Sequence, residues 1–189
     1  DLTGKTALVT GSSRGLGLQM ARALGEAGAR IMLCARNADG LETACADLQD
    51  AGIDARWVAA DCAVEADLQK LVSETLQRMG DIDILVNNVR DYFLLSQLVG
   101  KHSMIGRGGR IINVAHDTGK DAVINFTRAL AGEWGQSGIN VNAICPGLRR
   151  LGDNEDIKGS TLLFASAAGQ HITGQCLAVG GGVSAVEGA

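Results

Sequence analysis

Short apolar runs alternate with amphipathic helical patterns along the whole chain of 189 residues. Strands are expected at residues 6–9, 31–34, 56–60, 82–86, 110–114, 139–144 and 176–179, and helices at 16–27, 41–48, 68–79, 93–99, 122–134 and 157–167. Strict alternation with nearly continuous apolar strands predicts a parallel sheet covered by helices on both faces. With right-handed crossovers, residues 1–189 are expected to form a single α/β domain with a doubly wound, Rossmann-like sheet.

A glycine-rich loop joins the first expected strand to the first expected helix. In it, Gly11 permits a tight exit from the strand, Gly15 a close approach of the backbone to a phosphate, and Gly17 close packing of helix and sheet. The N–H groups and dipole of a helix N-terminus favour negative charge. The loop therefore predicts binding of a dinucleotide pyrophosphate, with a plain glycine turn as the alternative. The predicted cofactor-binding residues here are Gly11, Ser13, Arg14, Gly15, Leu16 and Gly17.

Two arginines refine the expected cofactor. Domains that bind NAD usually carry an acidic residue at the end of the second strand, where it bonds the ribose hydroxyl. The stretch 33–37 contains no acid, and it places Arg36 at that point. Arg36 and Arg14 suit a 2′-phosphate, because a guanidinium binds phosphate through paired hydrogen bonds. NADP(H) is therefore favoured over NAD(H); the alternative is that both arginines are solvated surface residues.

Composition and charge exclude several other classes. A net charge of −4 with no basic run argues against a nucleic-acid partner. No apolar run reaches membrane-spanning length and no secretory leader is recognisable, so a cytoplasmic protein without a membrane partner is expected. The five scattered cysteines contain no CxxC pair and are expected to be reduced and buried. The three histidines lack metal-ligand spacing, so no metal is expected.

Four motifs in order resemble the short-chain dehydrogenase/reductase family over essentially the whole chain. They are residues 10–17, Asp61-Cys62, 86–88, and 140–142 followed by Pro146-Gly147. The resemblance implies reversible hydride transfer between NAD(P)(H) and a small-molecule secondary alcohol or ketone. It also implies that Asp61 and Cys62 flank the adenine, that Asn87 and Asn88 line the cofactor side of the fourth strand, and that Pro146 and Gly147 border the nicotinamide. A capped turn is the alternative for the two asparagines.

Three further stretches are similar to particular members of that family. Residues 92–102, 122–135 and 172–179 lean towards gluconate 5-dehydrogenase, which implies gluconate and 5-ketogluconate as substrates. The alternative is a 3-oxoacyl-carrier-protein reductase. The resemblance also implies a homotetramer, with the helix at 122–134 and the last strand at the interfaces.

The catalytic pattern of the family is incomplete in this chain. Family members use a serine, a tyrosine and a lysine, the last two lying four residues apart on one helix face. Lys120 matches the lysine, which also holds the cofactor ribose. His116 stands at the tyrosine position, and Gly119 occupies a place usually taken by serine. Tyr92, the only tyrosine, falls in a different helix.

Compared with the family pattern, substrate-side loops are missing near 89–90, 115–117 and 148–149. All three joins follow the carboxyl ends of expected strands, where such sheets bind ligands. Three interpretations stay open. The 189 residues belong to a longer active chain whose loops carry the serine and tyrosine; the protein binds NADP(H) without turnover; or His116, which titrates near neutral pH, replaces tyrosine as the acid/base.

Overall fold

Seven parallel strands form one continuous sheet in the computed structural model, which describes residues 1–88, 92–115, 119–147 and 154–181. The strand order is β3-β2-β1-β4-β5-β6-β7, and every neighbouring pair is parallel. The expected doubly wound sheet is confirmed. The strands are β1 (Thr6–Thr10), β2 (Arg30–Ala35), β3 (Ala55–Ala59), β4 (Ile84–Asn87), β5 (Gly109–Val114), β6 (Ile139–Pro146) and β7 (Cys176–Val179).

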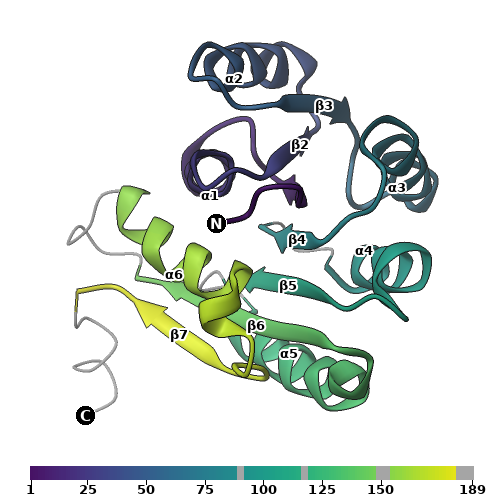
Figure 1. Ribbon diagram of the computed structural model, residues 1–189, viewed down its shortest axis with the longest axis vertical. Coiled ribbons are helices and arrows are strands. Elements are labelled where there is room, and N and C mark those ends of the chain that lie inside the picture. Colours follow the sequence, from purple (N-terminus) through teal and green to yellow (C-terminus); the bar gives the residue numbers. More distant parts are fainter. Residues whose placement is uncertain (89–91, 116–118, 148–153, 182–189) are drawn as a thin grey trace.

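Six α-helices in the described part of the chain cover the two faces of the sheet (Figure 1). They are α1 (Gly15–Glu26), α2 (Ala38–Asp50), α3 (Glu65–Met79), α4 (Tyr92–Val99), α5 (Lys120–Trp134) and α6 (Ile157–Ala165). One apolar cluster joins α1, α2 and α6 to the sheet, and a second joins α3, α4 and α5 to its other face. Successive strand residues point to opposite faces, so Val9 belongs to the first cluster and Leu8 to the second.

The sheet reverses its winding between β1 and β4. The chain runs from β1 outward through β2 to β3, then returns to the other side of β1 at β4. The helix that follows β1, α1, and the helix that follows β4, α4, lie on opposite faces of the sheet. In sheets of this type, ligands bind in the crevice at such a switch point. This topology places the glycine loop after β1 at the centre of the carboxyl edge.

Most elements begin or end up to three residues from the expected positions, and two of the differences have a visible local setting. The fourth strand begins at Ile84 rather than at 82, and the Ile82 backbone bonds the Ser103 hydroxyl instead of a neighbouring strand: its N–H donates at 2.7 Å and its carbonyl accepts at 3.1 Å. In addition, α4 continues into a π-helical turn at Gly100–Met104. Gly100 lies against the Trp134 ring, and a side chain there would overlap the indole.

The expectation that all cysteines are reduced and buried is wrong in part. Cys145 in β6 and Cys176 in β7 form a disulfide, and Cys62 is half-buried. The pairing of β6 with β7 brings the first two together although 31 residues separate them in sequence. Cys34 and Cys45 are buried as expected. Among the described residues, no helix combines the length and apolar character that crossing a membrane requires.

Candidate functional site

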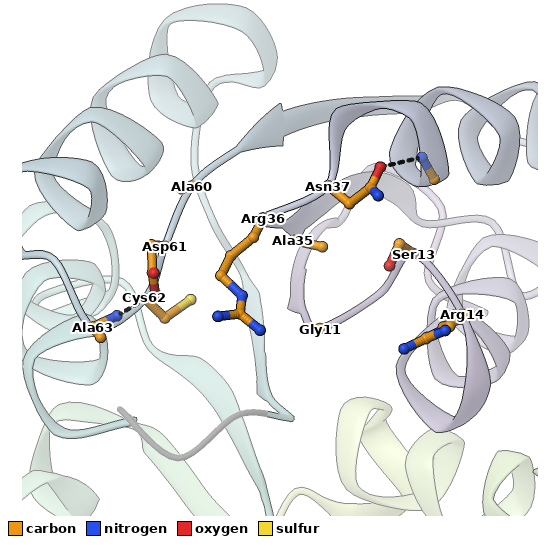
Figure 2. Close-up of a pocket in the computed structure, with 11 residues that line it drawn as sticks. Gly11, Ser13, Arg14, Ala35, Arg36, Asn37, Ala60, Asp61, Cys62 and Ala63 are labelled. Carbon is orange, nitrogen blue, oxygen red and sulfur yellow. Dashed lines mark hydrogen bonds between the residues drawn. The ribbon is translucent and has the colours of Figure 1, made fainter.

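A pocket of about 800 Å³ lies at the carboxyl ends of β1, β2 and β3 (Figure 2). The loops that follow these strands supply its walls, and the predicted residues from three separate sequence regions meet there. The lining residues are Gly11, Ser13, Arg14, Ala35, Arg36, Asn37, Gly40, Ala60, Asp61, Cys62 and Ala63. Sequence reasoning missed Asn37 and Gly40, although an asparagine directly before a helical pattern is a known capping signal.

Three glycines give the loop after β1 its shape. Gly11 and Gly15 have φ values of +60° and +62°, in the left-handed region that side chains disfavour. Gly17 is buried, and a Cβ there would overlap the Gly11 carbonyl oxygen and lie 2.7 Å from the Asn88 Nδ2 atom. The loop can therefore keep this path only with glycine at these positions.

The start of α1 is arranged to receive an anion. Arg14 precedes the helix in an extended conformation, and its side chain does not cap the first N–H groups. The first turn also contains no acidic residue. The first N–H groups of a helix have no partner within it, and they carry the positive end of its dipole. A phosphate group fits this position because it supplies acceptors and negative charge, which the Arg14 side chain and the first turn of α1 do not.

Two buried hydroxyl groups hold the loop in place. The Ser12 hydroxyl donates to the Val9 carbonyl at 2.7 Å and accepts the Cys34 N–H at 3.0 Å. The Thr10 hydroxyl accepts the Asn88 N–H at 3.0 Å, which ties the end of β1 to the end of β4. These positioning residues were not identified from the sequence, where small hydroxyl residues beside glycine look like ordinary turn residues.

The charges in the pocket favour a phosphate. Arg14 and Arg36 are exposed, and neither forms an ion pair with another residue that the structure describes. Asp61 is the only acidic residue among the lining residues, and its carboxylate accepts the Ala63 N–H at 3.0 Å. Asn37 caps α2 by accepting the Gly40 N–H at 2.9 Å. The edge after β2 thus presents a guanidinium where a carboxylate would repel a 2′-phosphate.

Asn87 lies inside the molecule rather than on the pocket wall. It is 1% exposed, and its Nδ2 atom donates to Ser96 Oγ and to Asn113 Oδ1, both at 2.9 Å. Asn113 in turn donates to the Thr127 hydroxyl at 2.9 Å. This chain of hydrogen bonds connects β4 and β5 with α4 and α5, so the direct role of Asn87 at the sheet edge is to position these elements.

Asn88 is half-buried and contacts the glycine loop directly. Its Nδ2 atom donates to the Gly11 carbonyl at 3.2 Å. The Oδ1 atoms of Asn87 and Asn88 are buried and accept no hydrogen bond from any described residue. A buried amide oxygen without a donor is costly, so both atoms retain the capacity to accept a hydrogen bond.

The remaining predicted residues lie outside this pocket. Pro146 ends β6, and the Gly147 N–H donates to the Val179 carbonyl at 2.8 Å. Leu16 is half-buried and packs against the apolar cluster beneath α1. Lys120 is half-buried at the first position of α5, beyond the carboxyl end of β5. The topology thus places Pro146, Gly147 and Lys120 on the same edge of the sheet as the pocket, whereas His116 falls outside the described residues.

Comparison with known proteins identifies similar chains. A family model described as short chain dehydrogenase matches residues 5–90 and 88–154. Gluconate 5-dehydrogenase of Gluconobacter oxydans is 28% identical over 97% of this chain and 96% of its own length. A 2-dehydro-3-deoxy-D-gluconate 5-dehydrogenase of Bacillus subtilis is 32% identical over 96% of this chain and 95% of its own. The crystal structure of an actinorhodin polyketide ketoreductase variant with NADPH superposes with a TM-score of 0.91 at 27% identity, covering 95% of this chain and 97% of that one.

The relatives contain internal segments that this chain lacks. The alignment with the Gluconobacter enzyme extends over 247 positions, although this chain has only 189 residues and 97% of it is included. The relative therefore contains segments that have no counterpart here.

A glycine substitution tests the geometry of the loop. Gly17→Ala is expected to weaken NADPH binding at least about tenfold, a loss of about 1.4 kcal/mol, because the new methyl group displaces the Gly11 carbonyl and the start of α1. The titration of NADPH fluorescence measures this loss. Gly159→Ala is the matched control: Gly159 is exposed in α6 with open space around it, so affinity should not change. Equal NADPH affinity in the two variants would contradict the loop assignment.

Proposed function

Because this chain belongs to the short-chain dehydrogenase family of NAD(P)-dependent oxidoreductases, we propose that its cofactor is NADP(H) and that its substrate is a sugar acid of the gluconate and 5-ketogluconate type. The reaction is reversible oxidation of a secondary alcohol to a ketone. The nicotinamide ring, when bound, supplies or accepts the hydride. The chain's own residues bind this cofactor, orient it and favour NADP(H) over NAD(H) at the adenosine ribose.

The observation that carries the cofactor proposal is the pair of arginines in the pocket. Arg36 leaves the end of β2, where an NAD-binding site would have an acid, and Arg14 lies on the opposite wall at the start of α1 (Figure 2). Both guanidinium groups are available to a 2′-phosphate. The ketoreductase with NADPH, which has the same fold, supports the same cofactor.

Two sugar-acid dehydrogenases among the relatives support the substrate class. Both align with nearly all of this chain, and both are named for oxidation at carbon 5 of a gluconate skeleton. The second candidate is reduction of a 3-oxoacyl thioester on a carrier protein, which the structural likeness to a polyketide ketoreductase favours.

The catalytic residues are proposed on position alone. Lys120 at the start of α5 would hold the ribose and support proton transfer. We propose that the 189 residues belong to a longer active chain, in which additional segments near 89–90, 115–117 and 148–149 carry the serine and the tyrosine. The competing proposals are a protein that binds NADP(H) without turnover, and His116 as the acid/base. The proposed phosphate-binding residues are compatible with all three.

We also propose that the protein assembles as a homotetramer through α5 and β7. Leu177 on the edge strand β7 is 38% exposed, and Phe93, whose ring packs 5.5 Å from that of Phe126 on α5, is 56% exposed. Covering such groups favours association. Light scattering should give about four times the chain mass of 19.6 kDa. A monomer at micromolar concentration would exclude the assembly.

Cofactor preference is tested at Arg36. The substitution Arg36→Ala removes charge-assisted hydrogen bonds to the 2′-phosphate. The dissociation constant of NADPH should therefore rise about tenfold to a hundredfold, while the dissociation constant of NADH stays constant. Arg56→Ala is the control, since Arg56 projects from β3 towards Asp54, away from the pocket. A parallel loss of both cofactors, or no loss of NADPH, would show that Arg36 does not read the phosphate.

Activity is tested by following NADPH absorbance with defined substrates. Gluconate with NADP⁺ and 5-ketogluconate with NADPH should show turnover, and an acetoacetyl thioester with NADPH tests the second candidate. If the His116→Ala variant binds the cofactor normally but loses turnover, His116 is the acid/base. Tight NADPH binding without turnover on any of these substrates would favour the binding protein instead.

A further inference from the structure

Two cysteines meet at the wall of the cofactor pocket. Cys34 lies near the end of β2 and is completely buried, with its sulfur 4.0 Å from the Ala60 carbonyl oxygen. Cys62 follows two residues after Ala60 and lines the pocket. Parallel pairing of β2 and β3 aligns Ala35 with Ala59, so both chains leave the sheet side by side. The Cys62 side chain lies beside the Cys34 thiol and is the main cause that raises the pKa of Cys34.

The two sulfur atoms differ in their access to solvent. Cys62 is half-buried, and Figure 2 shows its sulfur pointing into the pocket. Cys34 has no exposed surface, and its contact with Cys62, together with burial, raises the pKa of its thiol. A reagent entering from the pocket therefore meets Cys62 first, while Cys34 remains a protonated thiol directly behind it. This is the arrangement of an attacking and a resolving cysteine.

We propose that Cys62 and Cys34 form a reversible disulfide that weakens cofactor binding, with a small-molecule disulfide such as oxidised glutathione as the oxidant. The thiolate of Cys62 attacks one glutathione sulfur and releases one glutathione. The thiol of Cys34 then loses its proton and attacks the Cys62 sulfur of the mixed disulfide, releasing the second glutathione. Two protein thiols are oxidised, one glutathione disulfide is reduced to two thiols, and their protons pass to the leaving groups.

The expected effect on the pocket follows from the position of Cys62. Bonded sulfur atoms lie about 2.05 Å apart, much closer than two sulfurs in hydrogen-bond contact, so oxidation draws Cys62 away from the pocket and towards β2. The adjacent Asp61 is held by hydrogen bonds from its own N–H to Asp67 at 2.8 Å and from the Ala63 N–H to its carboxylate at 3.0 Å. Moving Cys62 strains this turn. The effect on NADPH rests on the proposed cofactor function, because Asp61 and Cys62 are expected to flank the adenine.

The remaining cysteines provide a matched control. Cys45 is also buried, but it lies in α2 with its sulfur against the Ala55 carbonyl and belongs to the apolar cluster on the other face of the sheet. The substitution Cys45→Ala should leave the formation of the Cys34–Cys62 disulfide unchanged. Cys34→Ala removes the resolving thiol, and Cys34 itself is not among the residues that line the pocket.

The experiment compares the reduced protein with protein treated with oxidised glutathione. Peptide mapping by mass spectrometry without reduction should show Cys34 linked to Cys62 in the wild type and in Cys45→Ala. In Cys34→Ala the glutathione adduct should instead persist on Cys62. Oxidation of the wild type should raise the NADPH dissociation constant about tenfold, and dithiothreitol should reverse the change. Saturating NADPH should slow formation of the linked peptide, because the cofactor covers Cys62.

The two readouts separate this inference from the proposed function. A wild-type protein that yields no Cys34–Cys62 peptide would overturn the inference, whatever its cofactor affinity. A linked peptide with unchanged NADPH affinity would overturn the effect on binding. Failure of the reduced protein to bind NADPH would contradict the proposed cofactor function and remove the effect on binding with it, while the linked peptide would still establish the disulfide.

Discussion

The pocket depends on how closely the first turn of α1 approaches the end of β1. Gly17 has no room for a side chain because the Gly11 carbonyl and the Asn88 amide already occupy that space. The contact sets the direction in which α1 leaves the loop, and hence where its unpaired N–H groups point. The same contact brings Asn88, at the end of β4, against Gly11. The course of the glycine loop, the junction of β1 with β4 and the direction of α1 therefore all follow from one missing Cβ.

Buried polar groups make this arrangement rigid. Thr10 ties the end of β1 to β4, Ser12 ties it to β2, and the hydrogen bonds of Asn87 and Asn113 carry the connection on to β5. A hydrogen bond of this kind contributes about 1 kcal/mol net, but a buried polar group left unpaired costs about 1–3 kcal/mol. The network therefore adds little to the stability of the fold, but it disfavours any other alignment of the strand ends, because that alignment would leave buried polar groups unpaired. The pocket edge formed by the ends of β1 and β2 is in this sense an extension of the core.

The sequence predicted the elements that depend on local pattern and missed those that depend on neighbours. The strands, helices and glycine loop could be identified because apolar periodicity and glycine spacing are local signals. The roles of Ser12 and Thr10 could not be predicted, since their partners lie on other strands. Asn87 was expected to line the cofactor side of its strand, but its burial depends on Ser96 and Asn113, which only the packed helices and strands bring together.

The sequence by itself determined a doubly wound sheet with a glycine-rich loop at its centre, because the alternation of elements and the spacing of the glycines are patterns of neighbouring residues. Only the tertiary structure decided which cysteines meet. Cys145, near the carboxyl end of β6, pairs with Cys176 at the start of β7, and Cys34 near the end of β2 lies beside Cys62, which follows β3. Each contact joins neighbouring parallel strands that a crossover separates in sequence, so the spacing of the cysteines does not predict it.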